Sequence, residues 1–189
     1  SHDEMEGQKG INRLVTYIID EGTIKYPKLK VNKIKTGLQA KSDDDSTRDL
    51  TYFVTEVPKE NIEFALDLES DRMQNIIVTE EILNNSKNKL KASYNAWRNE
   101  DVFEVGLIDI LSKMYPNGHP YRIDPWGITE QIDTLSIQTC QHFYNTYFAS
   151  NNAVLIIVGD IIPKDVTRLI HQYFSTLTPA ENIPSDPDL

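Results

Sequence analysis

The sequence predicts an α+β domain in which an antiparallel sheet is backed by helices. Apolar residues recur at helical spacing through residues 11–19, and a segment rich in β-forming residues follows at 50–57. Helical and strand patterns follow one another without the strict alternation that is typical of parallel α/β folds. With 189 residues, 39% of them hydrophobic, the chain is long enough to bury a substantial core.

The first helix has the clearest pattern in the chain. Gly22 follows it, as glycine often follows the end of a helix, because it adopts the left-handed backbone conformation without steric cost. The opposite, polar face carries Arg13, Thr16 and Tyr17. The apolar face, with members three or four positions apart, is formed by Ile11, Leu14, Val15, Ile18 and Ile19.

Three segments of the chain are predicted to form strands. Residues 38–42 and 50–57 are expected to form a hairpin, joined by a turn at 43–47, where aspartate and serine can bond to their own backbone. The continuous apolar run 153–158 predicts a buried strand.

Amphipathic patterns and helix caps predict the remaining elements. A single domain is expected over residues 1–177, and residues 178–189, which contain three prolines, are expected to form a linker or tail. Further helices are predicted at 58–72, 79–100, 103–114, 136–148 and from residue 163 to 174.

Composition narrows the classes of function. Nineteen basic and 29 acidic residues give a net charge of −10, which disfavours binding to nucleic acid. The single cysteine, Cys140, cannot form an intrachain disulfide or a cysteine zinc cluster, and its helical position predicts packing beside Ile137 and Tyr144. No apolar run is long enough to predict a membrane span.

The stretch from Gly10 to Thr23 resembles the zinc-binding helix of the insulinase/pitrilysin family of zinc peptidases, the inverzincins, which reads G-x-x-H-x-x-E-H-x-x-x-x-G-T. Further segments are similar to family blocks and follow in the family's order, so that the resemblance covers nearly the whole chain. These segments are residues 1–7, 66–73, 118–122, 127, 143–148 and 151–160.

The resemblance places four substitutions at the positions of the family's zinc chemistry. Arg13 and Tyr17 stand where the family has its two histidine ligands, and Thr16 stands where it has the glutamate that acts as general base. Tyr94 stands at the position of the glutamate that is the third ligand. Arginine is permanently cationic and cannot coordinate zinc, so the resemblance implies a domain that has lost its catalytic metal.

The family's fold implies that the helices carrying these four positions lie close together. Residues 1–7 resemble only the end of the strand that leads into the zinc helix, so the opening strands of the half-domain are expected to be missing from this stretch of sequence. Arg13, Tyr17 and Tyr94 are expected either to contact a bound peptide or to fill the space left by zinc, with a hydrogen bond to Tyr94.

The preferred interpretation is a non-catalytic, peptidase-like domain that pairs with a second insulinase-family half or subunit to enclose and position peptides or unfolded polypeptides. Zinc is expected only in that partner, and no cofactor is expected in this chain. One alternative is a scaffold or peptide-binding protein with no peptidase role. The other is an active zinc metalloendopeptidase with a site elsewhere, although the histidines at 2, 119, 142 and 171 form no H-x-x-E-H or H-E-x-x-H pair. The sequence does not identify the cellular compartment, and the bacterial periplasm or cytoplasm is favoured over the mitochondrion.

Overall fold

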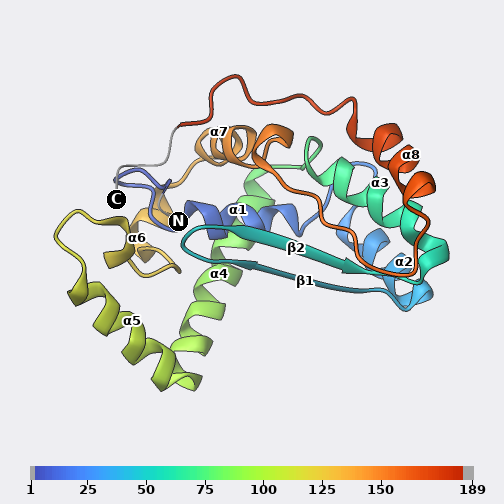
Figure 1. Cartoon of the computed structure of the whole chain (residues 1–189). Coiled ribbons are helices and arrows are strands. Elements are labelled where there is room, and N and C mark those ends of the chain that lie inside the picture. Colours follow the sequence, from blue (N-terminus) through green and yellow to red (C-terminus); the bar gives the residue numbers. More distant parts are fainter. Residues whose placement is uncertain (1–2, 185–189) are drawn as a thin grey trace.

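The structure, a computed structural model, describes residues 3–184. It has the predicted α+β class, in which many helices accompany one two-stranded antiparallel sheet (Figure 1). Its helices and strands are α1 (Ile11–Ile19), α2 (Lys28–Leu38), β1 (Lys41–Ser46), β2 (Thr51–Glu56), α3 (Ile62–Arg72), α4 (Glu80–Glu100), α5 (Val102–Met114), α6 (Thr129–Thr134), α7 (Ile137–Tyr147) and α8 (Pro163–Phe174), with short 3₁₀ turns at Lys59–Asn61, Pro120–Arg122 and Ser150–Asn152.

Helix α1 lies at the centre of the molecule. It contacts helices α4 and α7 and strand β1 (Figure 1). Leu14 and Ile18 are 0% exposed, and they belong to the main hydrophobic core together with Leu83 and Leu90 of α4. The apolar face predicted from the sequence is therefore the centre of the core.

The carboxylate of Glu4, which precedes α1 in the sequence, caps the N-terminus of this helix. Glu4 is buried, and its two carboxylate oxygens accept the backbone N–H groups of Gly10 and Asn12 at 3.1 and 3.0 Å. A negative charge at this end also interacts favourably with the helix dipole. Residues 2–4 are His, Asp and Glu, which are residue types that can bind a metal ion. His2 lies outside the described residues, and Glu4 caps α1.

Gly10 and Gly127 bring two distant segments into direct backbone contact. Both have positive φ, 101° and 90°, and a Cβ on Gly127 would lie 2.3 Å from Gly10 Cα and 2.6 Å from Lys9 O. The backbone N–H of Ile128 donates to Lys9 O at 3.1 Å beside this contact. No side chain larger than hydrogen fits at Gly127 without a backbone shift.

The hairpin forms, but the predicted strand and turn boundaries on its first side are wrong. Residues 43–45, predicted as the turn, lie in β1 and pair with Val54, Phe53 and Tyr52 of β2. The turn is formed by residues 47–50, where Thr47 N–H donates to Leu50 O at 2.8 Å. Cross-strand pairing and contact with α1 override the turn preference of the aspartates, and their charge suits a strand at a sheet edge.

The prediction of a buried strand at residues 153–158 is also wrong. The segment is extended but belongs to no sheet, and Val154, Ile156 and Val158 are 86%, 78% and 90% exposed. An apolar run becomes a buried strand only when a neighbouring strand satisfies its backbone, and residues 3–184 provide none.

The predicted helices and caps agree well with the structure. Ser136 caps α7 by accepting the Thr139 N–H at 3.1 Å, and Thr79 caps α4. Cys140 is buried in α7, and burial raises the pKa of its thiol to about 11. Part of the predicted linker, 178–189, lies outside the described residues. No helix among residues 3–184 is long and apolar enough to span a membrane.

The core position of Leu14 predicts a large loss of stability on truncation. Leu14→Ala should lower the free energy of unfolding by about 2–4 kcal/mol, because it leaves a cavity in the main core. Leu29→Ala on α2, where the leucine is 77% exposed, should change it by less than about 0.5 kcal/mol. Urea unfolding followed by circular dichroism measures both values, and equal effects would contradict a core centred on α1.

The contact between Gly10 and Gly127 predicts that alanine at position 127 destabilises the protein, whereas alanine at Gly106 does not. Gly127→Ala should destabilise the protein by at least about 2 kcal/mol, since it combines positive φ with a backbone clash. Gly106→Ala in α5, where a Cβ meets nothing within 4 Å, should stabilise by up to about 1 kcal/mol. Thermal unfolding of the two variants tests this, and a stable Gly127→Ala protein would show that the contact is loose.

Candidate functional site

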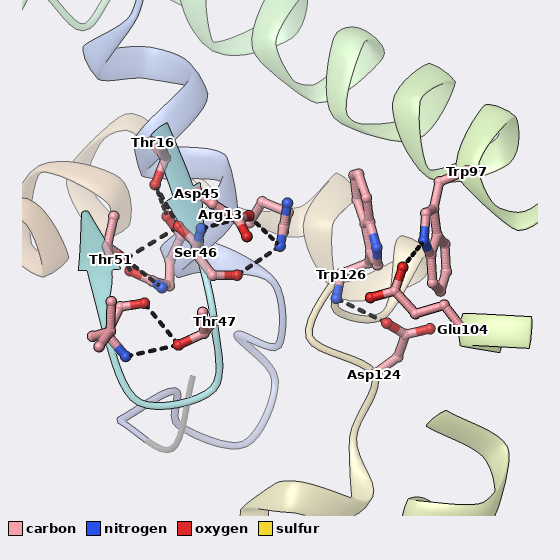
Figure 2. A network of polar contacts seen from close by, with 12 residues as sticks. Arg13, Thr16, Asp45, Ser46, Thr47, Thr51, Trp97, Glu104, Asp124 and Trp126 are labelled. Carbon is pink, nitrogen blue, oxygen red and sulfur yellow. Dashed lines mark hydrogen bonds and ion pairs between the residues drawn. The ribbon is translucent and has the colours of Figure 1, made fainter. Parts of the chain in front are cut away.

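Arg13 projects from the polar face of α1 and is held by three partners (Figure 2). Its Nη2 donates to Asp45 Oδ1 at 3.1 Å and to the backbone oxygen of Ser46 at 2.6 Å. Its guanidinium carbon lies 4.2 Å from the centroid of the Trp126 ring. The side chain is only 14% exposed, so its charge depends on these contacts for stabilisation.

Thr16 lies one turn further along α1 and joins a network of hydroxyl groups (Figure 2). Its Oγ1 donates to Asn12 O at 3.1 Å and lies 2.9 Å from Ser46 Oγ. Ser46 Oγ is in turn 3.1 Å from Thr51 Oγ1, so the network ties α1 to both strands of the hairpin. A hydroxyl that is buried and bonded in this way cannot replace a carboxylate as a general base at neutral pH.

Tyr17 is half-buried and packs against the main core. It also borders a polar pocket of about 180 Å³ between α1 and β1. Burial raises the pKa of the Asp44 carboxyl in this pocket, and the nearby Asp20 acts in the same direction while Arg72 opposes it. The pocket therefore favours a hydrogen-bond donor or a cation beside Asp44. Its lining residues are Arg13, Thr16, Tyr17, Asp20, Asp44, Asp45 and Ser46.

Tyr94 of α4 reaches the same region through Trp126. Its ring centroid lies 6.0 Å from those of both Trp97 and Trp126, and the two indoles are stacked 5.5 Å apart. The expected hydrogen bond between Tyr94 and the residues of α1 is absent from the described hydrogen bonds. The Tyr94 hydroxyl instead accepts from Arg98 Nη1 at 3.0 Å. Arg13 and Tyr94 are therefore linked because both contact the indole ring of Trp126.

The loop that carries Trp126 is fixed by its own polar contacts. The backbone N–H of Trp126 donates to Asp124 Oδ1 at 2.9 Å, and the indole Nε1 of the neighbouring Trp97 donates to Glu104 Oε2 at 2.8 Å (Figure 2). Burial raises the pKa of the Asp124 carboxyl, against the opposing effects of this hydrogen bond and of nearby arginines. These contacts hold the indole over the Arg13 guanidinium.

Sequence reasoning missed Trp126, Asp45 and Ser46, the three residues that hold Arg13. The sequence predicts a turn at 43–47 for Asp45 and Ser46, because their pairing with β2 and their contact with α1 are long-range. Trp126 directly precedes Gly127, which is one of the positions similar to the family. A buried arginine requires acceptors and often an aromatic face, and that requirement was the available signal for such partners.

The side chains at the four positions do not fit zinc. A guanidinium has no lone pair to offer, the two tyrosines are engaged with aromatic neighbours or the core, and the threonine is saturated by hydrogen bonds. Among residues 3–184, no group of three or more histidine, cysteine, aspartate and glutamate side chains is placed to hold a metal ion.

The remaining histidines of the described part lie away from this region. His119 stacks on Tyr115 with ring centroids 4.4 Å apart, and its Nδ1 accepts the Tyr121 N–H at 3.1 Å. His142 and His171 are exposed on α7 and α8. His119 therefore shapes its loop.

A central amphipathic helix covered by a hairpin and helices agrees with the α+β class predicted from the sequence. Residues 1–121 match the family model described as "Insulinase (Peptidase family M16)", and residues 134–189 match "Peptidase M16 inactive domain". The chain belongs to the insulinase family.

Curated relatives are bacterial proteins. The chain is 28% identical to "Probable zinc protease PqqL" of Haemophilus influenzae, with 95% of the chain and 20% of the relative aligned. It is 22% identical to "Zinc protease PqqE" of Helicobacter pylori, with 94% of the chain and 40% of the relative aligned. The chain thus spans less than half the length of either relative.

Solved structures share the fold over nearly the whole chain. A protease from Helicobacter pylori superposes with a TM-score of 0.86 at 22% identity, covering 99% of this chain and 46% of that one. The first half of the periplasmic protease PqqL from Escherichia coli gives 0.85 at 19%, covering 99% and 41%. Pitrilysin gives 0.85 at 15%, covering 100% and 20%. The chain therefore has the fold of one half-domain.

The contacts of Arg13 predict that lysine cannot replace it. Arg13→Lys keeps the charge but loses the planar fork and the stacking on Trp126, so the free energy of unfolding should fall by about 1–2 kcal/mol. Arg98→Lys, at an exposed arginine near Tyr94, should change it by less than about 0.5 kcal/mol. Urea denaturation measures the free energy of unfolding of both variants. Equal losses would mean that the planar guanidinium of Arg13 contributes no more to stability than that of an exposed arginine.

Proposed function

We propose that this chain is a non-catalytic half of an insulinase-family peptidase, which pairs with a zinc-bearing half or subunit and helps to enclose and position peptides. The observation that carries the proposal is the set of contacts that Arg13 makes within the domain. The sequence resemblance aligns Arg13 with the family's first zinc ligand, and its guanidinium is already bound to Asp45, Ser46 and Trp126. A side chain held in this way replaces the metal as the link between α1, the hairpin and the aromatic cluster.

The pocket beside α1 supports a role in peptide binding. It is bordered by Tyr17 and by residues of β1, and β1 pairs on only one side among the described strands. A peptide in extended conformation can add to such an edge, with main-chain hydrogen bonds to the strand and a side chain in the pocket. Tyr17 and Asp44 are the groups that would contact that side chain, whereas Arg13 is committed to its partners within the domain.

A second half is the partner that the proposal requires. The relatives are described as zinc proteases, and this chain aligns with 20% and 40% of their length. The partner would supply the metal-assisted attack of water on the peptide bond, and this chain would supply walls and substrate orientation. We place the protein in the bacterial periplasm, because one structural neighbour is described as a periplasmic protease.

Zinc analysis tests the proposal directly. The purified chain should hold far less than one equivalent of zinc by inductively coupled plasma mass spectrometry after dialysis against trace zinc. The triple variant Arg13→His, Tyr17→His and Tyr94→Glu should gain one tightly bound equivalent, because it restores three zinc ligands. The matched control Arg13→Ala, Tyr17→Ala and Tyr94→Glu should not, since it lacks the imidazoles.

Three outcomes would count against parts of this proposal. Stoichiometric zinc in the unchanged chain would support an active metallopeptidase. A folded triple variant without zinc would show that these three ligand positions are misassigned. If the protein, isolated from its source, associates with no polypeptide carrying an intact H-x-x-E-H helix, the alternative of a scaffold or peptide-binding protein would replace the role in a peptidase.

A further inference from the structure

A second pocket, of about 220 Å³, lies beside the first half of β1, at the end of the hairpin that is nearest α2 (Figure 1). It is bounded by the C-terminal end of α1, one face of α2, β1 and Arg72, the last residue of α3. The face of α2 contributes Lys28, Val31, Asn32 and Lys35, which recur at helical spacing. Cationic side chains therefore stand on two walls of this pocket.

The guanidinium of Arg72 is buried with most of its hydrogen-bonding capacity unused. Its side chain is 8% exposed, and the one hydrogen bond that it donates to the residues the structure describes is a long contact of 3.4 Å from Nη1 to Glu69 Oε1. Asp20 Oδ1 lies 3.8 Å from Nη2, which is beyond hydrogen-bond distance, and Nε has no partner within residues 3–184. A guanidinium has five N–H donors, and a buried charge is stable when it is paired and hydrogen-bonded. Arg72 can therefore donate to a further acceptor in the pocket.

Both cations of the pocket are held in place by the domain. The Tyr144 hydroxyl of α7 donates to the backbone oxygen of Arg72 at 2.6 Å, and Lys35 Nζ donates to Ser42 Oγ of β1 at 2.8 Å. Burial lowers the pKa of the Lys35 ammonium, and the charge of Arg72 acts in the same direction. An anion between the two side chains would offset this repulsion, and their fixed positions lower the entropic cost of binding it.

Two aspartates separate this pocket from the pocket between α1 and β1. Asp20 and Asp44 line both pockets, and their carboxylates oppose an anion that lies close to them. A hydrogen-bond donor or cation in the pocket between α1 and β1 would pair with these aspartates. An acceptor in the second pocket would pair with Arg72. The two pockets are thus complementary to a ligand that carries groups of opposite polarity.

The two pockets follow one another along β1. Ser46 lines the first and Ser42 lines the second, with Asp44 between them on the same face of the strand. Alternate side chains on one face of a strand are about 7 Å apart. A peptide added to the free edge of β1 would therefore direct two residues, with one residue between them, into neighbouring pockets.

We propose that the second pocket binds a carboxylate of the peptide, held by Arg72 and Lys35, two residues away from the side chain that enters the pocket between α1 and β1. The inference rests on the proposed function, because it requires a peptide along β1. A carboxylate matches the planar fork of a guanidinium, and its single charge suits two cations that stand beside two aspartates better than a doubly charged phosphate does. The carboxylate can come from a glutamate or aspartate side chain or from the C-terminus of the peptide.

Fluorescence anisotropy of short labelled peptides with the purified chain tests the proposal. A threonine-rich peptide with both ends blocked carries a lysine for the pocket between α1 and β1, and either glutamate or glutamine two residues before or after it. In one of the two orders, the glutamate peptide should bind at least about fivefold more tightly than the glutamine peptide, because only the carboxylate gains charge-assisted hydrogen bonds. A peptide that ends two residues after the lysine, with a free or an amidated C-terminus, distinguishes a terminal carboxylate from a side-chain one.

Lys35→Gln should reduce the preference for the carboxylate to less than about twofold, because it removes one of the two cations. Lys33→Gln is the matched control, since Lys33 is exposed on the same helix and lies outside the lining of the pocket, and it should leave the preference unchanged. Arg72→Gln should abolish the preference where the variant folds, as judged by circular dichroism. In the unchanged protein, the Nε–H resonance of Arg72 should shift on adding the glutamate peptide and stay in place with the glutamine peptide.

Equal affinity for the carboxylate and amide peptides, in both orders and with both kinds of C-terminus, would overturn the carboxylate pocket and leave peptide binding in place. A preference that survives Lys35→Gln, or that is lost in Lys33→Gln, would overturn it by locating the carboxylate elsewhere. Absence of binding by every peptide would overturn both this inference and the peptide-binding part of the proposed function.

Discussion

The structure depends on burying helix α1 on nearly all sides. Such a helix cannot leave its polar groups to water, so each must find a partner within the protein. Glu4 satisfies the N-terminal N–H groups, and Gly127 lets a distant loop approach Gly10 directly. Thr16 enters a hydroxyl network with the hairpin, and Arg13 binds three partners. The hairpin, the Trp126 loop and the N-terminal segment are all positioned by the polar needs of one buried helix.

Arg13 links helix α1 to the hairpin and, through the Trp126 indole, to helix α4. The guanidinium bonds to β1, and the Trp126 indole that it contacts is also in contact with Tyr94 of α4. The arrangement is electrostatically consistent, because a buried charge is stable only when it is paired and hydrogen-bonded. None of these groups activates water as a zinc ion does.

The molecule also leaves apolar surface uncovered in two places that are far apart in the sequence. One is the extended segment 153–158, and the other is α5, where Phe103 and Met114 face solvent. Both surfaces suit a domain that functions with other polypeptide around it, as expected of a chain that aligns with less than half of its relatives' length. The acidic net charge keeps such surfaces from associating without discrimination.

The sequence by itself determined most of the helices, several of their caps, the presence of a hairpin and the family, because these depend on local spacing and on ordered motifs. The face of α1 that enters the core could be read from Ile11 to Ile19, and the family resemblance predicts that Arg13, Thr16, Tyr17 and Tyr94 stand at the zinc-site positions. Only the tertiary structure revealed that Asp45, Ser46 and Trp126 hold Arg13, that Glu4 caps α1, and that residues 153–158 stay exposed. Each of these depends on contacts, or on missing contacts, between segments far apart in the chain, and periodicity along a sequence carries no information about which distant backbone or charge will be the neighbour.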